Sequence, residues 1–284
     1  MSKRAVLEEL YQDRKLSDGY PDLERLGVEF QASSQGSQEA ILYTPAFMQC
    51  VESLIDLRSG EKSVLVMGCG PRPYAVRWLT QHGYNARGVE PVGSSVESAR
   101  GFLGDLSMVV QGGAEQIPVD DGSQRVILME SVLEHVDSPQ KALSESMRVL
   151  SPGGVLFIYT TNRWKIRLSG YNGEYQVPFF NWFPDSVKES YVFQHLHYEP
   201  ALAQYNARPA FHWFSYSELC RLGRSAGFGS FYSLMDVVKP ENPLVANSRL
   251  RRFLLNRVRY SPWLRGLALT QMGGSSIFMV KRSN

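Results

Sequence analysis

The stretch SVLVMGCGPRPYAVRWL, residues 63–79, decides the fold. It opens with a short apolar run at 63–68, breaks into a glycine turn and continues with a helical pattern of apolar residues that ends near Gly83. This pattern predicts a strand, a tight turn and a helix. Glycines in such a turn let the backbone approach a ligand, and the start of the helix presents free N–H groups to it.

Further apolar runs extend this alternation of strands and helices. We predict strands at 85–90, 108–111, 125–130 and 153–161. Strands at 230–238 and 275–281 would complete the sheet, the second as a hairpin-like edge partner. Strands that alternate with helices are typical of a parallel sheet covered on both faces, so we expect an α/β fold.

Serine residues predict where several helices begin. Ser138 precedes a proline, which suits the first position of a helix. Ser94 and Ser215 are each followed three residues later by a glutamate, and this spacing predicts a capping box at both places.

Residues 1–60 look mostly helical, and the last helix of this segment is predicted to start at Thr44 and Pro45. The chain has three cysteines far apart, which build neither a disulfide framework nor a CxxC zinc site. The sequence has neither the apolar stretch of a signal peptide at its start nor about 18 consecutive apolar residues anywhere. We therefore expect a cytoplasmic protein.

A long irregular segment follows the strand at 153–161. Aromatic side chains make up 14 of the 52 residues at 163–214, against 12% for the whole chain. We call residues 163–211 the aromatic cap. Flat aromatic faces with polar handles suit an aromatic, isoprenoid or glycosyl small molecule, although the same residues could form only the core of the cap.

A carboxylate marks the end of the second strand. Glu90 lies twenty residues beyond Gly70, where it can accept hydrogen bonds from both hydroxyls of a ribose. An adenosine-containing cofactor is the leading inference. A dinucleotide fingerprint would need a third glycine where this chain has Pro73, so NAD is the weaker alternative.

Four segments together resemble the class I S-adenosylmethionine-dependent methyltransferases, in particular the type 11 branch with small-molecule substrates. They are VLVMGCG with GVEP, GGAEQIPVDDGSQRVILMESVLEHV, RVLSPGG with the strand after it, and FHWFSYSELCRLGRSAGF. The resemblance implies a Rossmann-like, seven-stranded, mostly parallel sheet over residues 61–284, with the last strand antiparallel and the aromatic cap inserted. It also implies S-adenosylmethionine across the carboxyl ends of the strands.

The resemblance assigns roles to positions in those segments. Gly68 and Gly70 would contact the methionine part of the cofactor, and Glu90 its ribose. Ala114 and Glu115 would lie beside the adenine.

The same comparison places Glu130 and Ser131 at the start of the loop under the sulfonium. Tyr43 could close over the sulfonium by a cation–π contact, or be a core residue. Family members usually have an acidic residue where Met67 stands and an aspartate where Gly113 stands. These two departures keep a non-catalytic cofactor-binding or scaffold protein as an alternative, besides a NAD-dependent oxidoreductase.

Methyl transfer from a sulfonium needs alignment and exclusion of water more than covalent help. For an oxygen acceptor a general base helps, and histidine titrates in the right range. We rank His197, His195 and His212 as candidates, and add His135, which matches a common family position. The first two alternate, so on an extended segment they would share a face. The expected reaction is direct O-methylation of a small molecule.

The end of the chain is basic, since no acidic residue follows Glu241. Leu250, Phe253, Leu254 and Val258 fall on one side of a predicted helix, and Arg249, Arg252, Asn256 and Arg259 on the other. Such a helix can pack on the sheet with solvated arginines, or contact an anionic group or a membrane surface. Nucleic acid is a minor option, because the rest of the chain is acidic.

Overall fold

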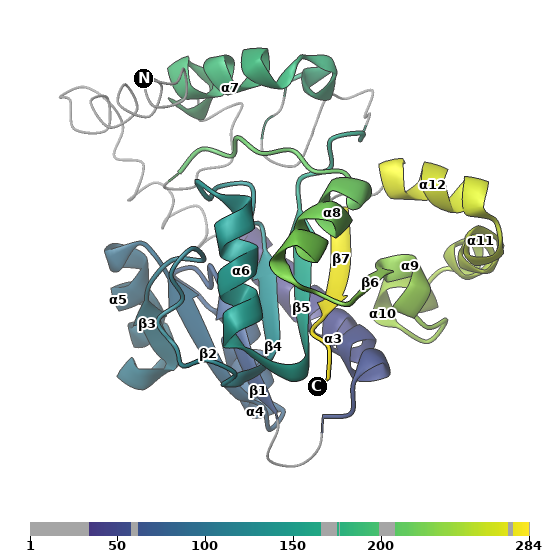
Figure 1. The fold of residues 1–284 in the computed structure, drawn as a ribbon. Coiled ribbons are helices and arrows are strands. Elements are labelled where there is room, and N and C mark those ends of the chain that lie inside the picture. The colour runs from purple at the N-terminus through teal and green to yellow at the C-terminus, as the bar shows by residue number, and fades with distance from the viewer. Residues whose placement is uncertain are drawn as a thin grey trace.

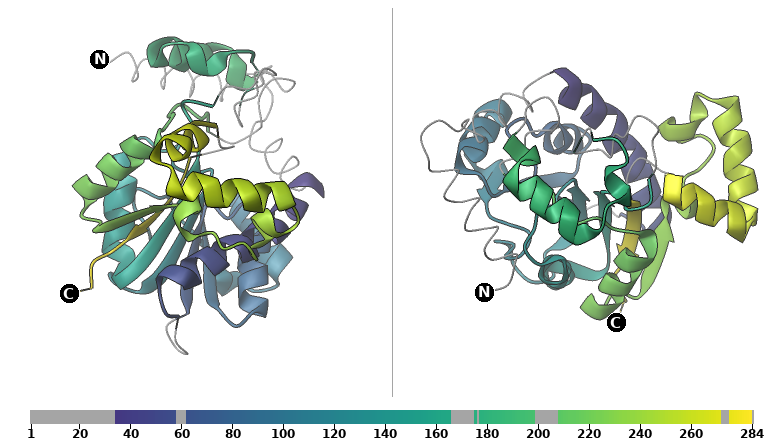
Figure 2. Two further views of the ribbon diagram at one scale, coloured as in Figure 1. Left: turned by 90° about the vertical axis from the view of Figure 1, so that its right-hand side faces the viewer. Right: turned by 90° about the horizontal axis from the view of Figure 1, so that it is seen from above.

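The computed structural model describes residues 34–57, 62–165, 175, 177–198, 208–271 and 275–283. In this part of the chain seven strands form one sheet of order β3-β2-β1-β4-β5-β7-β6. Neighbours from β3 to β5 pair in parallel, and β7 pairs antiparallel with both β5 and β6. Helices cover both faces (Figures 1 and 2). The expected Rossmann-like, mostly parallel α/β sheet is confirmed.

The strands are short and end close to the predicted residues. Their bounds are β1 Ser63–Met67, β2 Asn85–Glu90, β3 Val109–Gln111, β4 Gln124–Glu130, β5 Leu150–Thr160, β6 Ser230–Ser233 and β7 Ser275–Val280.

Ten α-helices and three 3-10 turns lie in the described ranges. The helices are α3 Ser34–Leu54, α4 Tyr74–Gln81, α5 Gly93–Leu103, α6 Pro139–Val149, α7 Asp185–Gln194, α8 Tyr216–Ala226, α9 Leu234–Val237, α10 Pro243–Ala246, α11 Arg249–Tyr260 and α12 Pro262–Gln271. The 3-10 turns are η1 Leu106–Met108, η2 Phe180–Trp182 and η3 Leu196–Tyr198.

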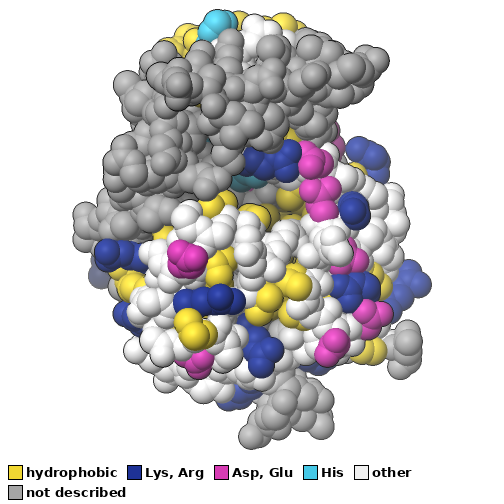
Figure 3. Space-filling model, turned by 90° about the vertical axis from the view of Figure 1, so that its left-hand side faces the viewer, with side chains coloured by type: hydrophobic (Ala, Val, Ile, Leu, Met, Phe, Trp, Pro, Cys, Tyr) yellow, Lys and Arg dark blue, Asp and Glu magenta, His cyan; other side chains and the backbone are white. Residues whose placement is uncertain are grey.

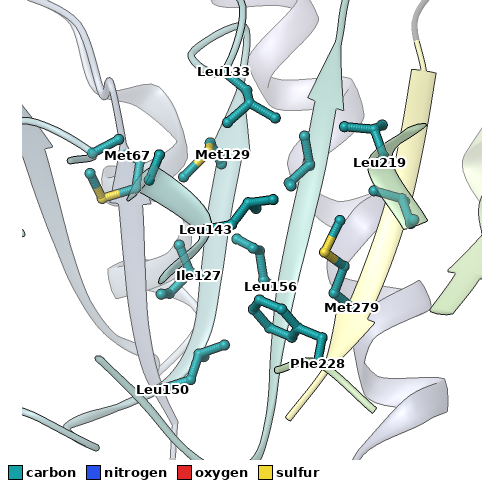
Figure 4. Packing of buried hydrophobic residues seen from close by; sticks show 14 of the residues in the cluster. Met67, Ile127, Met129, Leu133, Leu143, Leu150, Leu156, Leu219, Phe228 and Met279 are labelled. Carbon is teal, nitrogen blue, oxygen red and sulfur yellow. The ribbon is translucent and has the colours of Figure 1, made fainter. Parts of the chain in front are cut away.

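Each face of the sheet buries its own apolar cluster. On one face, side chains of β1, β4 and β5 pack against α6 and α8, and Leu143 and Leu219 lie among them (Figure 4). On the other face, Phe47 and Val51 of α3 and Leu79 of α4 cover the same strands. Shortening a buried leucine in such a core to alanine lowers the free energy of unfolding by about 2–5 kcal/mol. The two clusters therefore hold the strands, and with them the strand ends, in place.

Two of the predicted helix starts are confirmed. Ser138 accepts the Lys141 N–H at the start of α6, and Ser215 forms a complete capping box with Glu218 at the start of α8. That helix ends at Gly227, whose φ of 103° only glycine adopts readily.

The predicted capping box at Ser94 is wrong. Helix α5 begins at Gly93, after Val92, and no side chain caps it. The carboxylate of Glu90 binds the Val92 N–H at 3.1 Å, so the chain turns into the helix before it reaches Ser94.

The predicted start of the helix before β1 is also wrong. Helix α3 runs through Thr44 and Pro45, which lie in its interior. Proline removes one hydrogen bond from the helix, but Ala46, Phe47 and Val51 are fully or almost fully buried against the sheet. Tertiary packing therefore outweighs the local signal.

Two predictions for the last strands need correction. The predicted strand at 230–238 ends at Ser233, because a capping box of Ser233 and Asp236 starts α9 there. The strand at 275–280 does not lie at the edge: β7 inserts between β5 and β6. The edge strand is the four-residue β6.

The aromatic cap has a core of its own. Tyr175, Phe180, Phe193 and Phe211 are buried together, so part of the aromatic composition serves packing. Helix α7 lies beyond the carboxyl ends of the parallel strands (Figure 1). Within the described residues, no helix has the length and apolar character needed to cross a membrane.

Candidate nucleoside-binding site

The site is set by the topology of the sheet. From β1 the chain proceeds outward to β2 and β3, and from β4 it proceeds the other way to β5. The neighbours β1 and β4 therefore form the switch point. In open α/β sheets, ligands bind outside the carboxyl ends of the strands at such a point.

The glycine turn lies at this switch point. Gly68 and Gly70 have φ values of 60° and 68°, a conformation that residues with a Cβ rarely adopt. The Cys69 N–H donates to the Val89 carbonyl at 3.2 Å and ties the turn to β2. A Cβ on Gly88 would lie 2.5 Å from the Cys69 sulfur, so this glycine makes room for the turn.

Glu90 connects the ends of β1 and β2. One carboxylate oxygen accepts the Gly70 N–H at 3.0 Å, and the other accepts the Val92 N–H at 3.1 Å. Burial raises the pKa of Glu90 above its ordinary value. The two backbone hydrogen bonds act in the opposite direction and partly offset this rise. Each oxygen has a further lone pair, so the fixed carboxylate can still accept two hydroxyl protons.

The loop after β3 is the next part of the candidate site. Ala114 is buried, and a Cβ added to Gly113 would meet nothing within 4 Å, so space is open there. The Glu115 carboxylate accepts the N–H groups of Asp137 and Ser138 at 3.0 and 2.9 Å. This residue therefore holds the start of α6 against the loop.

The end of β4 contributes a carboxylate. Burial raises the pKa of Glu130 to about 7. Ser131, the next residue, has a φ of 51°, and its N–H donates to the Tyr159 carbonyl at 2.8 Å. This backbone turn fixes the strand end from which Glu130 projects.

An aromatic row lies on the α3 side of the same strand ends. Tyr43 stacks on Phe47 with ring centroids 5.8 Å apart, and Phe47 lies 6.4 Å from Tyr159. Tyr159 pairs with Glu130 across β4 and β5. The exposed Tyr43 therefore stands at the outer end of this row.

His195 and His197 do not share a face. His195 is exposed at the end of α7, and His197 is buried in η3. Burial, with a contribution from His135, lowers the pKa of His197 to about 3. The segment is helical rather than extended, and this is the physical reason for the separation.

The other two histidines contact backbone at the base of the aromatic cap. His135 Nδ1 lies 2.9 Å from the Arg208 carbonyl, and burial lowers its pKa to about 4. His212 Nε2 lies 2.9 Å from the Val136 carbonyl, which makes this nitrogen the donor. Both rings join the segment after β4 to the segment that leaves the cap.

Met67 belongs to the core. Its side chain is 2% exposed and packs with Met129 and Leu133 under α6 (Figure 4). A carboxylate at this position would be buried in an apolar cluster, so the methionine reflects packing. The departure therefore carries no argument against a functional site.

Sequence reasoning missed Glu134. Its carboxylate is buried and accepts the Thr160 hydroxyl at 2.7 Å, while its carbonyl accepts the N–H groups of Phe211 and His212. Burial raises its pKa to about 7. A glutamate inside the apolar run VLEHV was the available signal, since buried carboxylates need partners.

A glycine turn, a carboxylate after the second strand and a switch point are the combination with which many α/β sheets bind nucleosides. Residues 65–158 match the family model described as "Methyltransferase domain", type 11. That segment of the chain is similar to this methyltransferase family.

Curated relatives match the same part of the chain. A protein encoded in a Streptomyces fradiae transposon is 37% identical over 36% of this chain and 30% of its own length. An uncharacterized methyltransferase of Mycobacterium tuberculosis is 32% identical over 38% and 43%. A ubiquinone biosynthesis O-methyltransferase of Coxiella burnetii is 29% identical over 43% and 52%. The chain thus spans about a third to a half of the relatives it matches.

Solved structures share the fold. The plantazolicin methyltransferase BamL, solved with a substrate analogue and SAH, has a TM-score of 0.56 at 16% identity. The alignment covers 98% of this chain and 99% of that one. At this identity the likeness shows the arrangement of the strands and helices.

Proposed function

We propose that this protein is an S-adenosylmethionine-dependent methyltransferase that acts on an oxygen of a small molecule. The observation that carries the proposal is Glu90, held by two backbone N–H groups beside the glycine turn with acceptor capacity left for a ribose. The methyltransferase domain match supports the reaction class. The Coxiella relative, named as an O-methyltransferase, supports an oxygen acceptor.

The residues present fit the cofactor. Glu90 would bind the ribose, the space beside Gly113 and Ala114 would take the adenine, and the turn at Gly68 and Gly70 would face the methionine part. Tyr43, at the outer end of the aromatic row, can face a cation. When bound, the cofactor supplies a methyl group on a sulfonium.

Glu130 is the base that the geometry favours, in place of the four histidines. It lies at the end of β4, beside Tyr159 and the aromatic row, and its pKa of about 7 suits proton transfer at neutral pH. Glu130 would accept the proton of the acceptor hydroxyl. That oxygen would take the methyl group of the bound cofactor, and the electron pair of the broken sulfur–methyl bond would remain on the sulfur. His135 and His197 stay uncharged near neutral pH because burial lowers their pKa values.

Calorimetric titration with S-adenosylmethionine and its demethylated product tests the cofactor. We expect binding by the wild-type chain and about 1–3 kcal/mol weaker binding by Glu90→Ala, since charge-assisted hydrogen bonds are lost. Glu97→Ala, which removes an exposed carboxylate of α5, is the matched control and should bind like wild type. Thermal melts confirm that both variants fold.

Two outcomes would overturn the proposal. Absence of binding to either compound would remove the cofactor, and preferential binding of NADH would favour an oxidoreductase. Methyl transfer to a panel of phenols and other alcohols, followed by mass spectrometry, then tests the acceptor atom.

A further inference from the structure

Helices α11 and α12 project from the body beside the β6 and β7 edge of the sheet (Figures 1 and 2). Leu255 is the buried residue of α11. Arg259 fixes the helix to α9, because its guanidinium donates to the carbonyls of Met235 and Val238 at 3.0 and 2.5 Å. Of the two alternatives that the sequence left open, the first, with the apolar side packed on the sheet and the arginines in solvent, does not describe this helix.

The opposite side of α11 is apolar and exposed. Leu250, Phe253 and Leu254 lie at i, i+3 and i+4 on one face and are 66%, 56% and 47% exposed. Tyr260, Trp263 and Leu267 continue the exposed apolar surface onto α12 at 85%, 75% and 51%. We call these six residues the outer apolar face. Exposed apolar residues gathered this way mark an interaction site.

Unpaired arginines border the outer apolar face. In the part of the chain that the structure describes, Arg249, Arg252 and Arg257 pair with no carboxylate, and Arg257 lies 5.3 Å from the Phe253 ring. No acidic residue follows Glu241 in the sequence. The side of the molecule near α5 differs, since Figure 3 shows acidic and basic side chains interspersed there.

We propose that α11 and α12 bind the surface of a bilayer that contains anionic lipids. Leucine, phenylalanine and tryptophan would enter the boundary between headgroups and acyl chains, and the arginines would contact lipid phosphates. A nucleic acid backbone offers phosphates but no apolar layer for six exposed apolar side chains, so lipid fits both features. This inference does not depend on the proposed methyl transfer.

The surface is connected to the rim of the candidate site. Asn162, two residues beyond β5, donates to the carbonyls of Leu269 and Thr270 at 3.0 and 3.4 Å near the end of α12. Asn181 of the aromatic cap in turn donates to the Asn162 carbonyl at 3.2 Å. Asn162 therefore links the end of α12 to the aromatic cap.

Co-sedimentation of the full chain with vesicles tests the inference. We expect at least tenfold stronger binding to phosphatidylcholine vesicles with 30% phosphatidylglycerol than to phosphatidylcholine alone. The triple variant Leu250→Ser, Phe253→Ser, Leu254→Ser should lose at least tenfold, and so should Arg249→Gln, Arg252→Gln, Arg257→Gln. These side chains are exposed, so the variants should melt like wild type.

The control removes the same charge elsewhere: Arg87→Gln, Lys141→Gln, Arg221→Gln, all exposed on other elements. It should bind vesicles within twofold of wild type. The inference fails if anionic vesicles bind no better than neutral ones, or if the control loses as much as the arginine variant. It also fails if the serine variant binds unchanged, or if duplex DNA competes fully at equal phosphate, which would indicate a nucleic acid surface.

Discussion

Glu130 is buried enough for its protonation to bear on stability and, under the proposed function, on activity. Its pKa of about 7 lies above the ordinary value of 4.5, because burial disfavours the charged form. The carboxylate therefore appears as pH rises through 7. Because the pKa of Glu130 is raised on folding, its contribution to the free energy of unfolding is complete below pH 4.5. That contribution is lost as pH rises through 7.

We predict that Glu130→Gln removes the rise in methyl-transfer rate between pH 6 and 8, measured as kcat/KM. The same variant should be about 1–3 kcal/mol more stable than wild type above pH 8, since glutamine stays neutral. Urea melts at pH 5 and 8 measure this difference. A variant that keeps the wild-type pH profile would show that another group accepts the proton.

The position of Glu90 could be predicted from the sequence, whereas the surroundings of the four candidate histidines could not. Strand ends follow from local patterns, so Glu90 could be placed at the end of the second strand before the structure was known. Burial of His197 and the backbone contacts of His135 and His212 depend on how the aromatic cap packs. The pKa of Glu130 likewise depends on neighbours distant in sequence.

At the scale of elements, two identical sequence signals behave differently. Ser94 and Ser215 are both followed by glutamate at the third position, but only Ser215 forms the capping box. Local spacing predicts the possibility of a cap, and the Glu90 contact to Val92 decides against it at α5. We could predict most strands, α6 and α8 from the sequence, because the local preferences of their residues agree with the packing of the fold there.

We predict that Ser215→Ala lowers the free energy of unfolding by about 0.5–2 kcal/mol, because the Glu218 N–H loses its acceptor. Ser94→Ala is the matched control and should change stability by less than about 0.5 kcal/mol. Urea denaturation at pH 7 gives both values. Equal losses in the two variants would contradict the assignment of the caps.

The aromatic cap is tied to the sheet by charged groups. Lys188 of α7 is 1% exposed, pairs with Asp185 at 2.8 Å and lies 4.1 Å from the Trp213 ring. Arg163, just after β5, reaches the same Asp185 at 2.7 Å. Composition indicated a segment rich in aromatics but not these contacts, since Arg163 lies more than twenty positions from Asp185, and Lys188 from Trp213.

For the whole molecule, the candidate site joins four strand ends, so a ligand there should stabilise the entire fold. At one hundred times its dissociation constant, a ligand adds about 2.7 kcal/mol. We predict that the demethylated cofactor raises the melting temperature by about 5–10 °C. Differential scanning fluorimetry measures it, with Glu90→Ala at the same ligand concentration as the control. An equal rise in the melting temperature of Glu90→Ala would show that the ligand binds at another site.

The pairing of β6 with β7 does not constrain the length of the segment that connects these two strands. The two strands are antiparallel neighbours with Ser233 opposite Ile277, so the chain leaves the sheet after Ser233 and rejoins it beside the same strand at Ser275. A two-residue hairpin would close that gap as well. The pairing of β6 with β7 therefore sets no limit on how many residues lie between them, and the strand order of the sheet does not depend on helices α9 to α12.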